Sequence, residues 1–242
     1  KNNLLLKMAA DLRKKADFII AENKKDLDAA EKTGVSKALY DRLLLNRERI
    51  DGMAVSIEEI AMLPDPVGRI EKMTMRPSGI RVGQMRIPLG VVAVIYEARP
   101  NVTTDIAALC IKSGNAAILR GGKEAISSNT ALHAVVRGVL EESGCPESAV
   151  TFIGRTEREL VPELLKMKQY IDVVIPRGGE SLIKAVSEES TIPVIKHDKG
   201  VCHTFVDESA DEDMANRIAV NAKVQRPGVC NAMETLLVHQ AI

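Results

Sequence analysis

Aromatic side chains are scarce in this sequence, which has no tryptophan and only three tyrosines and three phenylalanines among 242 residues. This scarcity argues against a surface on which nucleic-acid bases stack. Neither sign of charge is in excess, because 33 lysines and arginines balance 33 aspartates and glutamates. The balance argues against nucleic acid and against a membrane surface as binding partners.

Long apolar runs and closely spaced cysteines are also missing. No apolar run approaches the roughly 18 residues that a membrane-spanning helix needs, and no signal peptide is recognisable. The cysteines show no CxxC pair and no histidine cluster accompanies them, which argues against a zinc site. They are Cys110, Cys145, Cys202 and Cys230. We therefore expect a reduced, cytoplasmic protein without a metal ion.

Residues 1–63 have the pattern of amphipathic helices. Leu4, Met8 and Leu12 recur at helical spacing, and charged residues fill the opposite face. Prolines at 64 and 66 end the helical region. No side chain here suggests chemistry, so we expect a layer that packs against the domain that follows.

From residue 80 onward, β-branched runs alternate with amphipathic segments. The predicted strands are 87–96, 115–120, 149–153, 171–175, 191–195, 203–206 and 234–239. The predicted helices are 105–113, 127–143, 157–166, 180–188 and 211–220. This alternation is typical of a parallel sheet in a doubly wound α/β domain.

Both ends of the sequence suggest a longer natural protein. Lys1 already lies inside a helical pattern, and the last predicted strand ends almost where the sequence does. We expect a short segment before residue 1 and a larger one after residue 242.

Ligands of an open parallel sheet bind beyond the carboxyl ends of its strands, and three segments of this chain follow strands directly. The first is 96–101, which ends in Asn101. The Asn101 amide could donate a hydrogen bond to a ligand, but asparagine is also a common helix cap. Both interpretations stay open on the sequence alone.

The other two segments are glycine turns. Gly121 and Gly122 are flanked by Arg120 and Lys123, so the backbone can approach a ligand that the two cations attract. Gly178–Gly179 precede a helix whose free N–H groups could hold a pyrophosphate. Neither turn matches the P-loop or the GxGxxG fingerprint, so each alone is weak evidence. Two such turns on one sheet would suit a dinucleotide.

The loop 225–231 (QRPGVCN) carries a cysteine between a proline–glycine pair and an apolar strand. Backbone N–H groups around Cys230 could stabilise a thiolate and later an oxyanion. A small buried hydrophobe is the common alternative for a lone cysteine. The loop therefore makes Cys230 a candidate nucleophile.

Taken together, the motifs resemble those of the gamma-glutamyl phosphate reductase (glutamate-5-semialdehyde dehydrogenase) family of the aldehyde dehydrogenase superfamily. The similarity extends over nearly the whole chain, in order and with compatible spacing. The matching stretches are 87–101 (IPLGVVAVIYEARPN), 114–124 (GNAAILRGGKE), 170–179 (YIDVVIPRGG), 200–203 (GVCH) and 225–239 (QRPGVCNAMETLLVH). The resemblance implies an aldehyde dehydrogenase-type α/β fold with N-terminal helices and only part of the catalytic domain.

The resemblance also implies an activity, which is the NADPH-dependent reduction of gamma-glutamyl phosphate to glutamate 5-semialdehyde in proline biosynthesis. Cys230 matches the family nucleophile, which forms a thioester and expels phosphate. Asn101 matches the asparagine that holds the oxyanion. The turn of Arg120–Lys123 falls where the superfamily binds the adenosine end of NADP(H), and Gly178–Gly179 fall near its pyrophosphate. Arg99 and Arg226 are further candidates for binding substrate.

Two departures accompany the resemblance. Hydrolytic aldehyde dehydrogenases carry a glutamate in the region that reads IKHDKG at 195–200 here, and an acyl-phosphate enzyme does not need that base. The charged residues 196–199 could assist phosphate, or form a solvated loop. We expect residues 1–223 to form the cofactor-binding domain, and 224–242 to begin a catalytic domain whose remainder is absent.

Partners and alternatives follow from the same resemblance. The expected partners are the acyl phosphate, phosphate, a second copy of the chain and the glutamate 5-kinase that supplies the substrate. One alternative is another thioester-forming aldehyde dehydrogenase, which oxidises its aldehyde or transfers the acyl group to coenzyme A. Another is a dinucleotide-binding module with no activity of its own. The residues that recognise the substrate side chain are not evident from the sequence.

Overall fold

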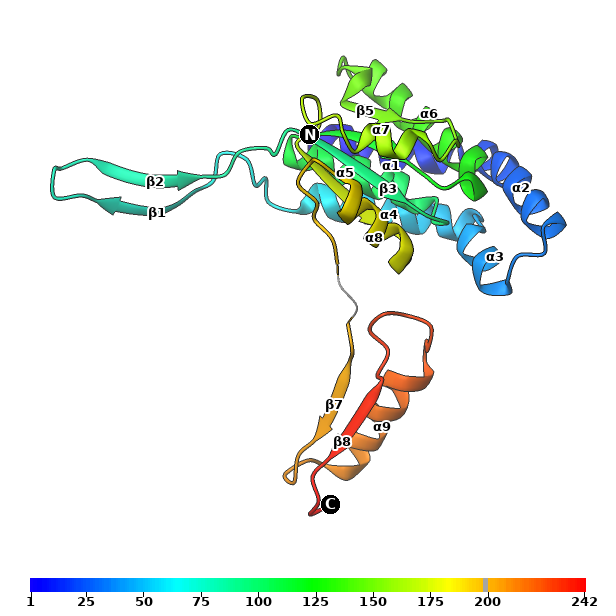
Figure 1. Ribbon diagram of the computed structural model, residues 1–242, viewed down its shortest axis with the longest axis vertical. Coiled ribbons are helices and arrows are strands. Elements are labelled where there is room, and N and C mark those ends of the chain that lie inside the picture. Colours follow the sequence, from blue (N-terminus) through cyan, green and yellow to red (C-terminus); the bar gives the residue numbers. More distant parts are fainter. Residues whose placement is uncertain (198–199) are drawn as a thin grey trace. The chain divides into compact units, whose positions relative to one another are not determined.

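The computed structural model describes residues 1–197 and 200–242, which fall into two compact units, 1–196 and 197–242. The first unit begins with helices α1 (Asn2–Lys14), α2 (Ala16–Lys32), α3 (Lys37–Leu43) and α4 (Arg47–Met62). Strands β1 (Ile70–Met75) and β2 (Arg81–Met85) follow. The remaining elements of this unit are β3 (Val91–Tyr96), α5 (Asn101–Ser113), β4 (Ala116–Arg120), η1 (Lys123–Ala125), α6 (Ile126–Glu142), η2 (Glu147–Ala149), β5 (Val150–Phe152), α7 (Leu160–Leu164), β6 (Val173–Arg177) and α8 (Glu180–Glu189). These elements confirm the predicted α/β class (Figure 1).

A parallel four-stranded sheet organises the first unit, with the strand order β5-β4-β3-β6. The chain starts at β3, moves outward through β4 and β5, and then crosses to the other side of β3 to form β6. Strand order therefore reverses between β3 and β6, and this switch point is where open α/β sheets bind ligands. The fold thus points to the carboxyl ends of β3 and β6.

The two faces of the sheet pack against different layers. Val92, Val94 and Tyr96 of β3 lie in one apolar cluster with residues of α1, α4, α5 and α6. Ala93 and Ile95 point to the opposite face, where a second cluster includes residues of α7 and α8. This period of two is what a strand buried on both faces requires. The expectation that residues 1–63 form a packing layer is confirmed.

Helix α2 anchors the beginning of α6 through buried polar groups. The Asp26 carboxylate accepts hydrogen bonds from the backbone N–H groups of Ser127 and Ser128, at 3.1 and 2.8 Å. Asn23 donates to Ser128 Oγ at 2.9 Å and accepts from the N–H of Leu45 at 2.9 Å. These bonds satisfy donors that a helix start leaves open, and they fix the segment that follows the first glycine turn.

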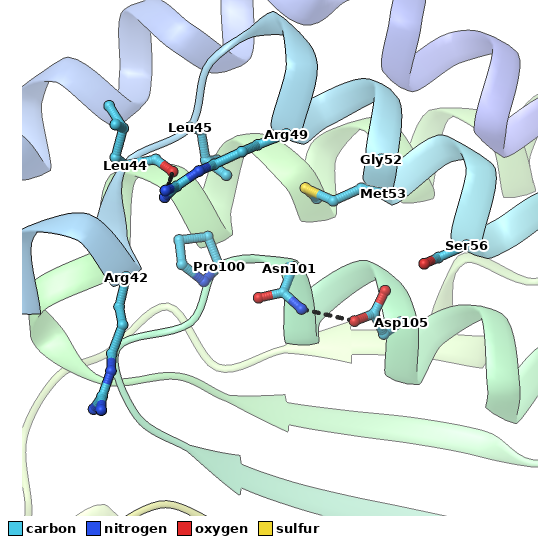
Figure 2. A pocket seen from close by; sticks show the side chains of 10 residues that line it. All are labelled: Arg42, Leu44, Leu45, Arg49, Gly52, Met53, Ser56, Pro100, Asn101 and Asp105. Atoms are coloured by element: carbon cyan, nitrogen blue, oxygen red, sulfur yellow. Dashed lines mark hydrogen bonds between the residues drawn. The ribbon is translucent and has the colours of Figure 1, made fainter. Parts of the chain in front are cut away.

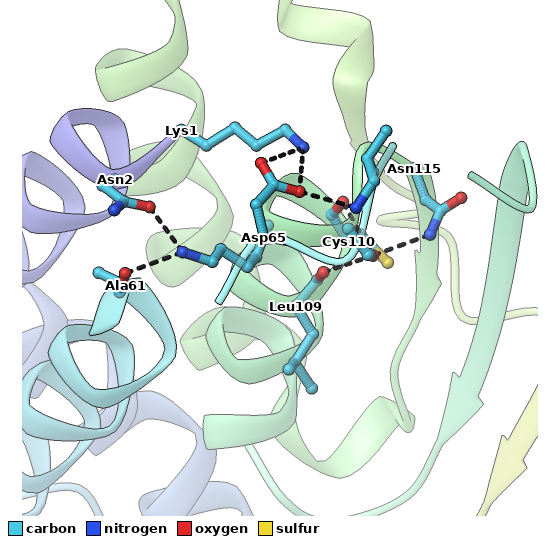
Figure 3. A network of polar contacts seen from close by, with 10 residues as sticks. Lys1, Asn2, Ala61, Asp65, Leu109, Cys110 and Asn115 are labelled. Carbon is cyan, nitrogen blue, oxygen red and sulfur yellow. Dashed lines mark hydrogen bonds and ion pairs between the residues drawn. The ribbon is translucent and has the colours of Figure 1, made fainter. Parts of the chain in front are cut away.

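The C-terminal end of α5 is tied to α1 and α4. The Lys112 ammonium is buried and donates to the Asn2 side chain at 2.6 Å and to the carbonyl of Ala61 at 2.8 Å, two acceptors that are labelled in Figure 3. Gly114 ends the helix with φ of 74°, a left-handed conformation that glycine adopts without strain. The helix is therefore held firmly at this end.

Three details differ from the sequence-based expectations. An antiparallel pair, β1 and β2, was not predicted, although Pro77 and Gly79 mark the turn between them. The predicted strand 191–195 was wrong, because only an isolated bridge joins Val194 to Val174, and Pro193 offers no N–H to extend it. The helix predicted at 157–166 is shorter, spanning Leu160–Leu164.

The second unit contains β7 (His203–Val206), α9 (Glu212–Val224) and β8 (Thr235–Val238). Strands β7 and β8 pair in parallel from His203–Thr235 to Val206–Val238. Strands 203–206 and 234–239 and the helix at 211–220 were predicted, and all three elements are present. None of the helices in the described part of the chain is long and apolar enough to cross a membrane.

Candidate functional site

Cys230 lies in the loop that joins α9 to β8 in the second unit, and its side chain is exposed. The loop is closed by backbone bonds, since the N–H of Met233 donates to Ala222 at 2.9 Å and that of Ala232 to Val229 at 3.1 Å. No described residue accepts a hydrogen bond from the N–H of Cys230. The loop thus offers an accessible thiol beside an open backbone donor, as the nucleophile interpretation requires.

The other cysteines have different surroundings. Cys110 is buried in α5, and burial raises the pKa of its thiol to about 11. Cys202 precedes β7 and donates its S–H to the carbonyl of Cys230 at 3.5 Å. Because the thiolate is the reactive form, the buried Cys110 is chemically inert at neutral pH. The buried-hydrophobe interpretation describes Cys110, whereas Cys230 is exposed.

Asn101 is the first residue of α5, and its side chain does not cap the helix. Its Nδ2 instead donates to the Asp105 carboxylate at 2.8 Å, one turn further along (Figure 2). The helix-cap interpretation is therefore wrong for this side chain. An amide NH₂ carries two protons, so the bond to Asp105 leaves a second donor for a ligand.

Asn101 and Asp105 line a cavity of about 260 Å³. The cavity lies between α4, the loop before it and the beginning of α5 (Figure 2). The lining residues are Arg42, Leu44, Leu45, Arg49, Gly52, Met53, Ser56, Pro100, Asn101 and Asp105. Burial raises the pKa of Asp105, and the hydrogen bond from Asn101 partly offsets this effect.

The turn between β3 and α5 is strained and held from two sides. Ala98 has φ of 38°, in the left-handed region that alanine rarely adopts. Its N–H donates to Glu124 Oε1 at 2.7 Å, which joins this turn to the one after β4. The Glu97 carboxylate accepts from the N–H of Gly179 at 2.9 Å, which joins it to the turn after β6. The three predicted segments therefore meet at one edge of the sheet.

The glycine turn after β4 is surrounded by polar groups without partners. Arg120 donates from Nη2 to the carbonyl of Thr156 at 3.3 Å, but its buried Nε makes no hydrogen bond within the described residues. Asn129 Nδ2 is likewise buried and unpartnered, and it lies 2.2 Å from where a Cβ of Gly121 would stand. Two orphaned donors beside a turn without side chains fit an anionic or hydroxylated ligand group.

The turn after β6 is filled differently. A Cβ at Gly178 would stand 2.6 Å from Glu97 Oε2, so this glycine is required for the close approach of the carboxylate. The N–H of Gly179, which was expected to face a pyrophosphate, already donates to Glu97. Glu97 thus occupies a donor at the beginning of α8, and a bound pyrophosphate would have to displace it. The residues present fit the adenosine end of NADP(H) better than the pyrophosphate.

The remaining predicted residues are on the surface. Lys123 is exposed and makes no ion pair with any described residue, and Gly122 beside it is buried against Glu124. Arg99 is exposed in the strained turn. Arg226 is exposed in the Cys230 loop of the second unit. Of the charged stretch 196–199, Asp198 and Lys199 lie outside the described residues.

Four polar residues at this edge were not foreseen from the sequence, namely Glu97, Asp105, Glu124 and Asn129. Only Asp105 had a local signal, because it lies four residues after Asn101 and therefore on the same helix face. The others contact residues from distant segments. No group of three or more histidine, cysteine, aspartate or glutamate side chains in the described ranges could hold a metal ion.

Comparisons with known proteins place this geometry in context. No family model matches the chain. Over all 242 residues it is 59% identical to the gamma-glutamyl phosphate reductase of Citrifermentans bemidjiense, of which it covers 58%. The chain thus spans a little over half the length of the curated relatives it matches.

Solved structures agree with this similarity. The crystal structure of gamma-glutamyl phosphate reductase from Thermotoga maritima matches 99% of the chain with a TM-score of 0.92 and 44% identity, over 58% of that protein. An acetylating aldehyde dehydrogenase from Geobacillus thermoglucosidasius matches the whole chain with a TM-score of 0.65 and 21% identity, over 50% of its length. The second match shows that the fold is shared with aldehyde dehydrogenases.

Proposed function

We propose, from the premise that the chain belongs to the gamma-glutamyl phosphate reductase family of the aldehyde dehydrogenase superfamily, that the whole protein reduces gamma-glutamyl phosphate to glutamate 5-semialdehyde. Phosphate is the second product and NADPH the reductant. The observation that carries the proposal is the exposed Cys230 thiol beside a backbone N–H with no acceptor among the described residues.

The Cys230 thiolate attacks the acyl carbon of the substrate, and the carbonyl oxygen becomes an oxyanion. As the resemblance implies, we propose that the backbone N–H of Cys230 and the Nδ2 of Asn101 donate to this oxygen, because such donors stabilise the oxyanion of acyl transfers. Collapse of the adduct expels phosphate and leaves a thioester on Cys230. This thioester is the covalent intermediate that is then reduced.

When bound, NADPH supplies the hydride that reduces the thioester carbon. Its adenosine end is held by the turn of Arg120–Lys123, where the orphaned Arg120 Nε and Asn129 Nδ2 lie. Gly178–Gly179 would face its pyrophosphate only if Glu97 released the N–H of Gly179. In this proposal the backbone N–H of Cys230 and the Nδ2 of Asn101 also hold the oxygen of the resulting thiohemiacetal, which collapses to release the aldehyde and the Cys230 thiolate.

In this proposal residues 1–223 serve cofactor binding and residues 224–242 begin the catalytic domain. The strained turn at Ala98 fixes the peptide that leads into Asn101. Arg99 and Arg226 are proposed to attract the anionic substrate. The full-length protein is proposed to be a homo-oligomer that receives its substrate from a glutamate 5-kinase.

The test uses the full-length protein in the oxidative direction, with glutamate 5-semialdehyde, phosphate and NADP⁺. The expected result is NADPH formation that requires phosphate and is not supported by coenzyme A in its place. Cys230→Ser should lower turnover below ~10⁻³ of the wild type, because a lost nucleophile is not replaced by any other group.

Cys202→Ser is the matched control, because Cys202 lies in the same unit and contacts the Cys230 carbonyl through its side chain alone. It should keep most of the activity. Turnover retained by Cys230→Ser would contradict the covalent mechanism. Activity with coenzyme A but not with phosphate would instead identify an acylating aldehyde dehydrogenase.

A further inference from the structure

Asp105 is a partly buried acid without a cationic partner. The only hydrogen bond that its carboxylate accepts from another described residue comes from Asn101 Nδ2, at 2.8 Å. An ionised carboxylate has about four acceptor positions, so one bond leaves most of its capacity unused. Burial raises the pKa of Asp105, as expected for a carboxylate that has lost water and has not gained a cation.

The second carboxylate oxygen of Asp105 is available to a ligand. Figure 2 shows one oxygen directed to Asn101 and the other directed away from it, toward α4. Asp105 lines the 260 Å³ cavity together with Asn101, so a molecule in the cavity can meet both side chains.

The cations that line the cavity do not neutralise Asp105. Arg49 donates from Nη2 to Asp41 Oδ1 at 2.6 Å and from Nη1 to the carbonyl of Leu44 at 2.9 Å. Arg42 is exposed and forms no ion pair within the described residues. The carboxylate therefore faces the cavity with its charge uncompensated.

We propose that Asp105 binds the α-ammonium group of the amino-acid substrate and so determines specificity for an α-amino acid over an otherwise identical acid. This inference rests on the proposed function, which assigns Asn101 to the oxygen of the reacting carbonyl. The proposed substrate has one cationic group, four bonds away from its reacting carbon.

The geometry of Asn101 and Asp105 accommodates the length of the substrate. The Asn101 amide and the Asp105 carboxylate are 2.8 Å apart, so two ligand atoms that each lie about 2.9 Å from one of them can be separated by several ångströms. Four bonds of about 1.5 Å each span roughly 5 Å when extended. A substrate whose carbonyl oxygen accepts from Asn101 therefore places its ammonium group within reach of Asp105.

The test compares two aldehydes in the phosphate- and NADP⁺-dependent reaction of the full-length protein. Glutamate 5-semialdehyde carries the ammonium group, and 5-oxopentanoate has the same aldehyde and carboxylate without it. Asp105→Asn keeps the shape of the side chain and an oxygen that can accept from Asn101, but has no charge. In this variant the kcat/KM for glutamate 5-semialdehyde, divided by that for 5-oxopentanoate, should fall roughly 10- to 100-fold. Most of the change should be a lower kcat/KM for glutamate 5-semialdehyde.

Asp17→Asn is the matched control, because Asp17 is an exposed carboxylate on α2 that pairs with Arg47 at 2.5 Å. Its ratio should equal that of the wild type. Asp105→Glu, which keeps the charge, should recover part of the discrimination. If Asp105→Asn does not fold, as judged by its melting curve, Asp105→Ser serves for the same comparison.

Two failures are distinguishable. An equal loss of kcat/KM for both aldehydes would overturn the inference, since Asp105 would then act only by positioning the Asn101 amide. A wild-type protein that shows no phosphate-dependent oxidation of glutamate 5-semialdehyde would overturn the proposed function itself, and with it this inference.

Discussion

The two ends of helix α5 satisfy their polar groups in different ways. At the C-terminal end, the buried Lys112 has two acceptors on other helices, Asn2 and Ala61, both labelled in Figure 3. Gly114 ends the helix without strain. At the N-terminal end, the Asp105 carboxylate has a single donor (Figure 2). Ala98 in the preceding turn is strained. The polar side chains at the C-terminal end of α5 thus have their partners within the protein, whereas the Asp105 carboxylate at the N-terminal end lacks a cationic partner. We call the N-terminal end the incomplete end.

Hydrogen bonds connect the N-terminal half of α5 to Asn129, which lies beside the glycine turn after β4. Thr103 of α5 hydrogen-bonds to the Tyr96 hydroxyl at 2.7 Å and donates to Asn129 Oδ1 at 3.0 Å. Asn129 Nδ2 then ends this chain of bonds without a partner. Unsatisfied buried groups lower stability, and they are retained where a ligand completes them. On our proposal, the difference between the two ends separates residues that bind ligands from residues that hold the fold.

Among substitutions in and around α5, the largest effect is expected at Asn101. If its amide donates to the oxyanion, Asn101→Ala in the full-length protein should lower kcat by roughly 10²–10³-fold. The side chain caps no backbone group, so the expected loss of stability is only that of its bond to Asp105, about 1 kcal/mol. Steady-state kinetics and a melting curve on the same variant measure both quantities. A destabilised variant with a normal kcat would place Asn101 among the structural residues.

The opposite outcome is expected at Lys112. Lys112→Met keeps the apolar stem but leaves the Ala61 carbonyl without its donor, which should lower the free energy of unfolding by about 1–3 kcal/mol. The kcat should not change. Lys7→Met, which removes an exposed partner of Glu142, is the control and should alter stability far less. A lower kcat in Lys112→Met at normal stability would contradict a purely structural role for the C-terminal end of α5.

A substitution of Lys123 tests whether the glycine turn after β4, close to the N-terminal end of α5, binds the cofactor. NADPH differs from NADH by a 2′-phosphate, and an exposed lysine after both glycines is placed to pair with it. Lys123→Ala should weaken NADPH binding by roughly one to two decades, the value of a charge-assisted contact, and leave NADH binding nearly unchanged. Titration of both cofactors measures this. Equal weakening would show that Lys123 contacts a group the two cofactors share.

The sequence predicted what depends on local pattern. The apolar run of β3 and the alternation of strands and helices gave the sheet, and the QRPGVCN loop singled out Cys230. The hairpin of β1 and β2 was missed because its side chains are nearly all exposed, so no apolar alternation marks it. Its only signal was the turn at Pro77–Gly79.

The contacts of the candidate site depended on distant segments and could not be predicted. Gly178 was interpreted as a place for a ligand, but the structure puts the Glu97 carboxylate there. Glu97 and Gly179 are 82 positions apart in the sequence, and the pairing of β3 with β6 brings them together. An acid at the beginning of a helix satisfies the same N–H groups as a phosphate, so the local pattern of the two cases is identical.

The smallest effect concerns the pH dependence of stability at Asp105. Burial raises the pKa of this carboxyl above its ordinary value of 3.8, so the folded protein binds the proton more tightly than the unfolded chain does. The ionised carboxylate therefore lowers stability above the folded-state pKa, and this penalty disappears as the pH falls toward 3.8.

Asp105→Asn should consequently melt at a higher temperature than the wild type at pH 7, and the difference should shrink on acidification. The arginines that line the cavity remain charged over this range and do not contribute to the difference. Melting curves of both proteins from pH 7 down to the ordinary carboxyl pKa of 3.8 measure it. An Asp105→Asn protein that is less stable than the wild type at pH 7 would mean that the carboxylate is already compensated, and that the N-terminal end of α5 is as complete as the other.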